Sequence, residues 1–393
     1  MTSDLKEYKL GNICEILSSK RIFAADYVSE GIPFYRSKEI IQKSLGREID
    51  EKLYISKDKF DLIKKHYGAP TEGDILISAV GERSGIPYLV QNETFYFKDG
   101  NLIWLRNFNK SIIDSHYLCY WFKSMIGQSS LNNLMIGSAQ RALTIIGIKG
   151  ISIKLPPLET QRKIAKVLGA IDDKIELNNS INKNLEQQAQ AIFKSWFIDF
   201  EPFGGIKPDD WEIRTLDEFC NIFTGRKNAN EFDENGRNKF FTCGPNPLTI
   251  NSFIYDGKAI IISGNGAYTG RTRFYEGKFD LYQRTYACTP LDKEHEDFIY
   301  LFYIIVKNVL QRKIMGGTHG SAIPYIVMND IAKFEINYNA RIFESLSKII
   351  KSIVNQILHY EEENEQLTQL RDTLLPKLMN GEIDVDKVEV NKI

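Results

Sequence analysis

Apolar residues recur at alternating spacings of four and three in two long segments, residues 156–199 and 339–380. This spacing is the heptad pattern of helices that pack as a coiled coil. It predicts two helices of about 35 to 40 residues, each about 50 to 60 Å long at ~1.5 Å per residue. The alternative is a pair of amphipathic helices that lie on a globular core.

The expected contact positions form one seam on each helix. On the first helix they are Ile164, Leu168, Ile171, Ile175, Asn178, Asn182, Leu185, Ala189, Ile192 and Trp196. On the second they are Leu346, Ile350, Ile353, Ile357, Tyr360, Asn364, Leu367, Arg371, Leu374 and Leu378. Asn182 and Asn364 are equivalent positions. A buried Asn costs stability but fixes the register of a coiled coil, so we expect this role for both, with a solvated or locally frayed position as the alternative.

The segments before each long helix combine short apolar runs, glycine turns and helical patterns. The predicted strands include 74–80 and 258–264, and the predicted helices include 116–126 and 298–310. This mixture indicates two mixed α/β domains, residues 1–155 and 200–338, and leaves 381–393 as a tail. Pro156-Pro157 is expected to end the preceding strand, with Thr160 as the cap of the first long helix.

The two domains repeat one pattern in the same order. Segment 214–226 matches segment 8–20 at an offset of 206 residues, and segment 260–270 matches 75–85 at an offset of 185. The matched pairs include Ser78 with Ser263, Gly81 with Gly266, and Gly85 with Gly270. The smaller offset places extra residues in the first copy, around 46–68. The sequence therefore predicts an α+β fold in which two homologous domains are separated by two long helices that form an antiparallel coiled coil, with a pseudo-twofold internal repeat.

Composition restricts what such a scaffold can bind. The chain of 393 residues has 50 basic and 51 acidic residues and a net charge of −1, so any contact with DNA must come from local patches. No apolar run reaches the ~18 residues of a membrane-spanning helix and the start lacks a signal peptide, which predicts a cytoplasmic protein. The five cysteines include no C-x-x-C pair, which favours reduced, buried thiols over disulfides or a zinc site.

The sequence contains no recognisable catalytic motif. The five histidines have no metal-ligand spacing, and neither a nucleophile elbow nor a P-loop occurs. Residues 264–270, GNGAYTG, follow a predicted strand as a dinucleotide-binding loop would. However, RTRFYEGKF after it alternates like a strand, where that fold requires a helix. We expect no catalytic and no metal site in this chain; an enzyme with an unfamiliar site is the remaining alternative.

Two homologous domains on two long helices indicate a protein that binds two separate patches of its partner. The loops after the matched segments differ between the copies, as expected if each domain recognises different bases. Basic pairs occupy equivalent positions in both copies and can contact phosphates. The candidate DNA-binding residues are Lys20, Arg21, Arg36, Ser37, Lys38, Arg83, Ser84, Gln140, Arg141, Arg226, Lys227, Thr242, Asn246, Tyr268, Arg271, Arg273, Gln283, Arg284 and His319. For any one of them, ordinary loop variation on a protein-binding domain is an equal alternative.

Five motifs in this order resemble a known family. They are LPPLETQRKIAKVLGAIDDKIELNN (155–179), AQAIFKSWFIDFEP (189–202), DDWEIRTLDEF (209–219), GNGAYTGRTRFYEGKFDLYQRTYAC (264–288) and LRDTLLPKLMNGEIDV (370–385). With the layout of domain, helix, domain, helix, they cover nearly the whole chain, which is similar to the specificity subunits of type I restriction-modification enzymes. The resemblance implies two target-recognition domains, each binding one half of a split DNA sequence in the major groove, and no catalysis in this subunit.

The same resemblance implies partners and cofactors. The partners would be double-stranded DNA, two methyltransferase (modification) subunits that use S-adenosylmethionine to methylate adenine, and motor-nuclease (restriction) subunits that need ATP and Mg. No cofactor is expected in this chain itself. One departure is that INYNARIFESLSK enters the second helix without Pro-Pro, which puts a partner contact there in doubt. The competing hypothesis is a tandem protein-binding adapter that bridges partners without DNA recognition, and the net charge near zero slightly favours it.

Overall fold

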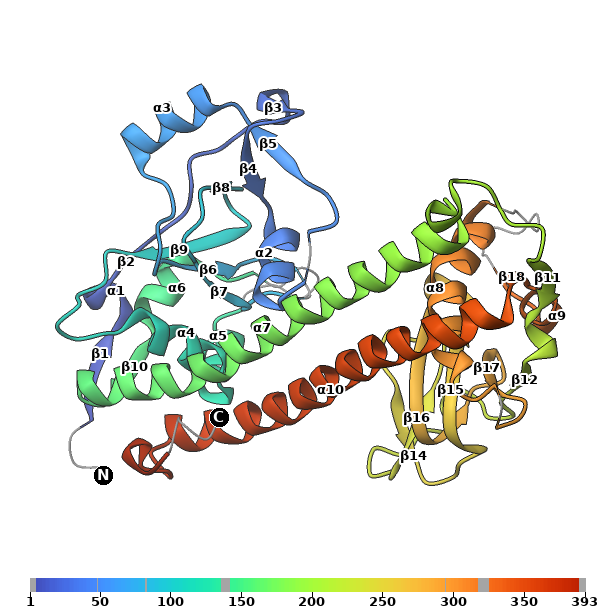
Figure 1. The fold of residues 1–393 in the computed structure, drawn as a ribbon. Coiled ribbons are helices and arrows are strands. Elements are labelled where there is room, and N and C mark those ends of the chain that lie inside the picture. Colours follow the sequence, from blue (N-terminus) through green and yellow to red (C-terminus); the bar gives the residue numbers. More distant parts are fainter. Residues whose placement is uncertain are drawn as a thin grey trace. The chain divides into compact units, whose positions relative to one another are not determined.

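The computed structural model of the chain describes residues 5–47, 49–81, 83–135, 142–293, 295–316 and 325–388. It divides into two compact units: unit 1 consists of Met1–Leu177 and Glu363–Ile393, and unit 2 of Asn178–Glu362. Two long helices, α7 (Leu158–Phe197) and α10 (Ala340–Met379), each contribute one half to either unit (Figure 1). Each unit therefore consists of one globular domain and two half-helices.

Domain 1, the globular part of unit 1, contains three small sheets. Strands β1 (Lys6–Lys9) and β10 (Ser152–Leu155) form an antiparallel pair. The second sheet has the order β2 (Glu15–Leu17), β9 (Leu102–Arg106), β6 (Ile75–Ser78) and β7 (Pro87–Leu89). The third has the order β3 (Tyr27–Val28), β5 (Leu53–Ile55), β4 (Ile32–Tyr35) and β8 (Tyr96–Phe97), and β4 and β8 are parallel.

In the described part of domain 1, six short α-helices complete the fold. They are α1 (Leu10–Ile13), α2 (Ser37–Ser44), α3 (Lys57–Tyr67), α4 (Ser115–Lys123), α5 (Met125–Asn133) and α6 (Ile145–Gly150). The main core of the unit joins apolar residues of α1, α4, α5 and α6 to Ile164 and Leu168 of α7 and Leu378 of α10. The segment 116–126, predicted as one helix, is instead two helices that meet at Ser124. Its hydroxyl accepts a hydrogen bond from the backbone N–H of Gly127 and so starts a new helix.

Domain 2, the globular part of unit 2, has one larger sheet. Its order is β12 (Cys220–Thr224), β17 (Thr285–Pro290), β15 (Tyr255–Ser263), β16 (Thr272–Leu281), β13 (Asn238–Phe241) and β14 (Leu248–Ile250). A separate antiparallel pair joins β11 (Glu212–Thr215) to β18 (Glu335–Tyr338). The helices of the domain are α8 (Phe298–Gly316) and α9 (Met328–Ala332).

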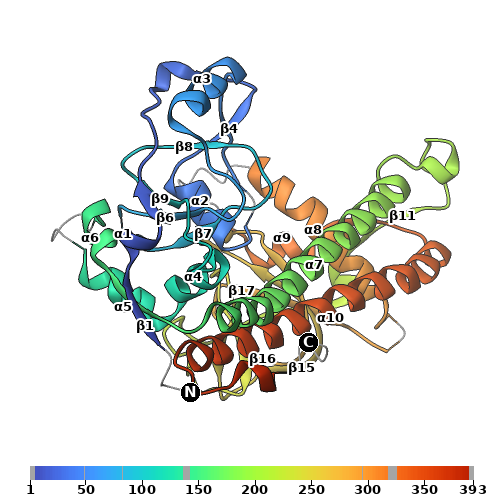
Figure 2. The ribbon, with the colours of Figure 1, turned by 90° about the vertical axis from the view of Figure 1, so that its left-hand side faces the viewer.

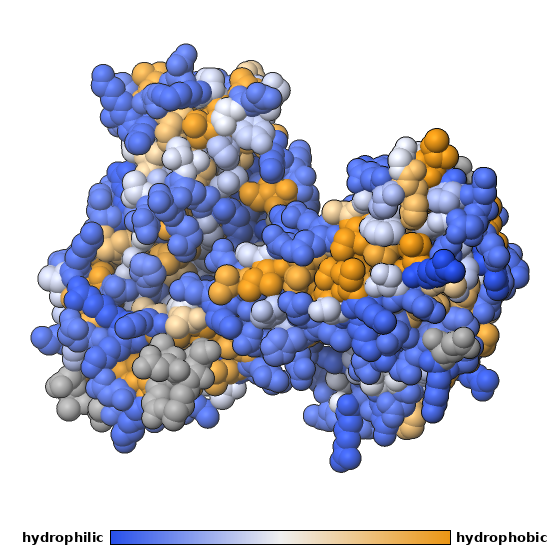
Figure 3. Space-filling view, in the orientation of Figure 1, coloured by the Kyte–Doolittle hydropathy of each residue, from blue (hydrophilic) through white to orange (hydrophobic). Residues whose placement is uncertain are grey.

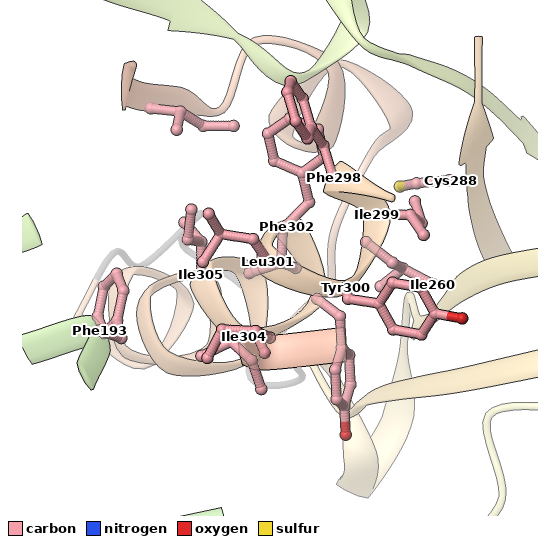
Figure 4. Packing of buried hydrophobic residues seen from close by; sticks show 14 of the residues in the cluster. Phe193, Ile260, Cys288, Phe298, Ile299, Tyr300, Leu301, Phe302, Ile304 and Ile305 are labelled. Atoms are coloured by element: carbon pink, nitrogen blue, oxygen red, sulfur yellow. The ribbon is translucent and has the colours of Figure 1, made fainter. Parts of the chain in front are cut away.

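The core of unit 2 lies between α8, the sheet and the two half-helices. Figure 4 shows Phe298, Phe302 and Ile305 of α8 pointing into this core together with Ile260 of β15 and Phe193 of α7. The middle of β15 pairs on both sides, because Ile260 lies opposite Phe274 of β16 and Cys288 of β17. The second half of this strand, 259–263, is therefore buried, as its apolar run Ala259–Ile262 predicts.

Hydrogen bonds confirm the internal repeat. The N–H groups of Gly85 and Gly270 donate to the carbonyls of Ser78 and Ser263 at 2.7 and 2.8 Å. The first glycines of the two turns, Gly81 and Gly266, also correspond. Their φ angles of +102° and +80° favour glycine. The extra residues of the first copy include α3, and the fully described segment 238–263 of domain 2 holds no such helix.

The two half-helices of each unit lie side by side (Figures 1 and 2). In unit 1 they are antiparallel, because Asp172 and Lys174 of α7 pair with Arg371 and Glu363 of α10 at 3.0 and 3.4 Å. Every predicted seam position is buried or half-buried. The fold class predicted from the sequence is therefore confirmed.

Two details of the helices differ from the predictions or refine them. Helix α7 begins at Leu158, and Gln161 N–H donates to the carbonyl of Pro157 at 3.1 Å, so Thr160 lies inside the first turn and is not the cap. Asn182 of unit 2 is half-buried, and its amide donates to the carbonyl of Ile357 at 3.3 Å across the helix pair. A bond to the backbone of the facing helix is compatible with a role in register, which stays a prediction for Asn182 and Asn364.

Candidate nucleic-acid interface

Four loops of domain 2 that carry candidate residues are held together. We define them as loop cluster 2: residues 225–228 after β12, 242–247 after β13, 264–273, which connect β15 to β16 and include the first two residues of β16, and 282–284 between β16 and β17. Gln283 N–H donates to the carbonyl of Lys227 at 3.0 Å, and Gly264 N–H donates to the carbonyl of Arg284 at 2.9 Å. The Cys243 thiol donates to the same Arg284 carbonyl at 3.2 Å. Residues far apart in sequence thus form one surface.

A close backbone approach fixes the first of these loops. A Cβ on Gly225 would lie 1.8 Å from the carbonyl oxygen of Leu281, where only glycine fits. The approach brings the end of β16 beside the residues that follow β12. It positions Arg226 and Lys227 next to Gln283 and Arg284, so the two pairs that the sequence singles out belong to one site.

Loop cluster 2 has a surplus of positive charge. Among the described residues, four of its arginines form no ion pair with a carboxylate: Arg226, Arg271, Arg273 and Arg284. Lys227 lies 3.5 Å from Glu231. Asn246, Gln283 and Tyr268 are exposed, the last by 37%, whereas Thr242 is buried and its hydroxyl accepts a hydrogen bond from Gly244 N–H. Positive charge beside exposed amide and phenol groups suits phosphates and base edges.

Loop cluster 1 is the corresponding surface of domain 1. It consists of the described residues 18–21 after β2, 36–38 after β4, 79–81 and 83–86 between β6 and β7, and 98–101 between β8 and β9. Ser37 hydroxyl donates to the carbonyl of Asn101 at 2.7 Å, and Arg21 forms an ion pair with Asp99 at 2.8 Å. The backbone N–H of Ala79 also donates to Asn101, as that of Gly264 does to Arg284 in domain 2.

Sequence analysis missed the segment 98–101 in loop cluster 1. It holds the cluster together and includes Lys98 and Asn101 as polar side chains. The offset of 183 that aligns YLCY (117–120) with YLFY (300–303) also aligns Gly100-Asn101 with Gln283-Arg284. Extending the repeat alignment backwards would have identified it, whereas residue type alone could not, because the aligned residues are different.

Three cations of loop cluster 1, Arg21, Arg36 and Lys38, are paired with acidic residues of the domain. Lys38 lies 3.6 Å from Asp50, and Arg21 is paired with Asp99. Lys20 and Arg83 are exposed, and the Lys20 ammonium lies 5.1 Å from the centre of the Tyr67 ring. The Ser84 hydroxyl contacts the Met135 sulfur at 3.3 Å. Gln140, Arg141 and His319 lie outside the described residues.

Arg36 is the most constrained of these candidates. Its guanidinium bonds Glu39 at 2.7 Å and Glu51 at 2.8 Å, and Glu39 is only 1% exposed. Burial opposes ionisation of Glu39, but hydrogen bonds from Arg36 outweigh it and lower the pKa of that carboxyl group. The arrangement fixes the start of α2 and favours a structural role for Arg36 over a base contact.

Replacing Arg36 with Ala is therefore expected to destabilise the protein by about 1–3 kcal/mol, because the buried Glu39 loses its charged partner. Denaturant unfolding measures the loss. Lys38→Ala is the control, since its exposed ion pair should contribute less than about 0.5 kcal/mol. Unchanged stability in the Arg36 variant, together with altered DNA recognition, would contradict the structural role.

The described residues contain no cluster of three His, Cys, Asp or Glu side chains that could hold a metal ion. Four of the five cysteines are buried, and burial raises the pKa of the Cys14 and Cys288 thiols to about 12. Cys14 and Cys220 belong to the two main cores at equivalent positions of the repeat. The described segment 264–270 joins two antiparallel strands, β15 and β16, so the expected strand-turn-strand is confirmed in place of a dinucleotide-binding loop.

Comparison with known proteins follows this geometry. Residues 2–187 and 208–366 match the family described as type I restriction modification DNA specificity domain. The chain belongs to this family. Its two matched segments correspond to the two copies of the repeat, each with the long helix, or part of it, that follows the domain.

Relatives of similar length support the assignment. The specificity subunit of the type I restriction enzyme MjaIX from Methanocaldococcus jannaschii is 27% identical over 71% of this chain and 71% of its own length. That of HindI from Haemophilus influenzae is 24% identical over 97% of this chain and 100% of its own length. The crystal structure of a type I restriction-modification S subunit from M. genitalium has the same fold, with a TM-score of 0.65 at 18% identity over 96% of this chain and 97% of that one.

These matches do not favour the adapter hypothesis, since a family defined by DNA specificity accounts for both domains. Among the described residues, no helix is long and apolar enough to cross a membrane.

Proposed function

We propose that this chain is the sequence-specific DNA-binding subunit of a type I restriction-modification complex, in which each domain recognises one half of a bipartite DNA sequence. The observation that carries the proposal is one scaffold present twice with unlike loop clusters. Loop cluster 2 has four unpaired arginines, whereas in loop cluster 1 the cations at 21, 36 and 38 are paired with acidic residues. Domains that recognised the same bases would need the same side chains in the same places.

The long helices are proposed to set the distance between the two half-sites and to bind the methyltransferase subunits. Apolar side chains are exposed on both helices, where Figure 3 shows an apolar strip among polar groups. They include Leu177 (55%) of α7 and Ile349 (48%) and Leu370 (39%) of α10, and Ile198 (55%) follows the end of α7. Exposed apolar groups that gather in one patch are typical of a surface that binds another protein.

Catalysis is assigned to the partner subunits. The methyltransferase subunits would use S-adenosylmethionine, and motor-nuclease subunits would use ATP and Mg, while this chain would hold no cofactor. The described residues of this chain bring together loops rich in arginine and amide groups, which suit binding more than bond breaking.

The purified chain alone is expected neither to cleave nor to methylate DNA. Co-expressed with its cognate methyltransferase subunit, it should form a complex with two methyltransferase copies per chain, because the heptad helix occurs twice in the chain and each copy is proposed to bind one methyltransferase. Native mass spectrometry measures the stoichiometry, and base-resolved sequencing measures adenine methylation. Methylation by the isolated chain would refute the division of labour, and a stable complex with a single copy would refute the binding of one methyltransferase by each copy of the helix.

A further inference from the structure

Two arginines of loop cluster 2 converge on one backbone oxygen. Arg271 Nη1 donates to the Pro245 carbonyl at 3.0 Å, and Arg273 Nη2 donates to the same oxygen and to the Gly244 carbonyl at 3.3 Å. Both side chains thus point from the start of β16 to the loop that follows β13. Pro245 itself is exposed, so the place where the two guanidinium groups meet is open to solvent.

The charge of this pair is not neutralised nearby. A carbonyl oxygen accepts hydrogen bonds but carries no net charge, and neither arginine forms an ion pair within the described ranges. Burial of Arg273, and then the positive charge of Arg271, lower the pKa of the Arg273 guanidinium. The negative charge of Glu361 of α10 acts in the opposite direction. Arginine stays protonated in proteins, so the pair keeps two adjacent positive charges that an anion would stabilise.

Tyr268 orients one member of the pair. The guanidinium carbon of Arg271 lies 4.0 Å from the centre of the Tyr268 ring, so the ring covers one face of the guanidinium plane. The N–H groups along the edge of the plane stay available. An edge of two parallel N–H donors matches two oxygens of a phosphate.

A phosphate fits this pair better than a base does. A guanine offers two acceptors in the major groove, which one arginine already satisfies, and it carries no charge to relieve the second. The pair is also specific to domain 2. At the offset of 185 the corresponding residues of domain 1 are Ile86 and Tyr88, neither of which is basic.

We propose that Arg271 and Arg273 jointly bind a single backbone phosphate of the DNA and do not contact a base. The proposal rests on the proposed function and adds to it that this part of loop cluster 2 positions the DNA, while neighbouring exposed groups such as Asn246 and Gln283 remain for the bases. It also makes the two halves of the protein unequal, because domain 1 has no such pair.

The test uses the complex with the methyltransferase subunits and duplexes that contain the sequence methylated by the wild type. The variants are Arg271→Gln, Arg273→Gln and the double variant, and dissociation constants are measured against salt concentration. Each single variant should weaken target and non-target duplexes by the same factor and change the slope of log K against log salt little, because the remaining arginine still neutralises the phosphate. The double variant should reduce the slope by about 0.9, the value for one phosphate.

Two further variants serve as controls. Lys278→Gln removes a charge from the same strand. Lys278 precedes Phe279, which lies opposite Lys239 of β13. Lys239 is near the end of β13 that is farther from Gly244. The Lys278 variant should leave the slope unchanged. Replacing both arginines by lysine keeps the charges and should largely preserve the slope, which separates loss of charge from loss of folding.

Neutral methylphosphonate substitutions along the duplex locate the contact. One position should weaken binding of the wild type and have no effect on the double variant. An altered methylated sequence with an unchanged slope would show base contacts instead, and a slope reduced by about 1.8 in the double variant would show two separate phosphates. Both outcomes overturn this proposal alone. A wild-type complex without any sequence preference would overturn the proposed function itself.

Discussion

Replacing residues 1–155 with the corresponding domain of a family member is expected to change one half of the methylated DNA sequence and to leave the other half as it is. The physical reason is that each loop cluster is held by hydrogen bonds within its own domain, such as Ser37 to Asn101 and Gln283 to Lys227. Neither cluster depends on the other for its shape. Base-resolved methylation mapping in cells that carry the complete complex measures the outcome.

The donor domain must fit the helices that remain. Ile164 and Leu168 of α7 and Leu378 of α10 belong to the core of domain 1, so a donor with apolar contacts for these residues is required. The reciprocal exchange of domain 2 is the control and should alter the other half-site. If either exchange altered both halves, the domains would not recognise DNA independently.

Inserting one heptad between Asn178 and Leu185, with a second between Tyr360 and Leu367, should increase the number of unrecognised base pairs between the half-sites. A heptad lengthens a helix by about 10 Å and keeps the seam in phase. At ~3.4 Å per base pair the increase is at most about three base pairs, and less if the helices are inclined to the DNA or the DNA bends. The insertions fall at the boundary between the two units.

The half-site sequences should stay the same, because no loop is altered. Inserting two residues at each place is the matched control: it rotates the seam by roughly 200° and should destabilise the complex rather than change the spacing. Robust methylation at the original spacing in the heptad variant would mean that the helices only tether the domains.

The long helices and the repeat could be predicted because both depend on periodicity. The seam from Ile164 to Trp196 follows from spacing alone, and Gly81 and Gly266 occupy turns where a side chain would be strained. Periodicity could not predict whether each lysine or arginine forms an ion pair with an acidic residue. Arg36 is neutralised by its sequence neighbour Glu39 and also by Glu51. Glu51 comes close to Arg36 only because β4 pairs with β5.

Sequence periodicity also could not predict which half of each long helix belongs to which unit. A heptad pattern identifies the face of a helix that is buried, but not the core that receives each part of it. In the structure the core of domain 2 includes Leu185, Phe193 and Phe197, which precede that domain in the chain. The described boundary near Asn178 therefore divides α7 where the sequence shows no break.

The order of synthesis gives this arrangement a consequence for folding in the cell. Leu378 and Val385 belong to the core of domain 1, yet more than 200 residues separate them from Leu168 of the same core. At about 5–20 residues per second, a ribosome needs about 10 to 40 s to make that interval. During this time the nascent domain 1 exposes apolar groups that only the end of the chain covers, which makes it a substrate for chaperones. The domain that leaves the ribosome first is thus the one whose core is completed last.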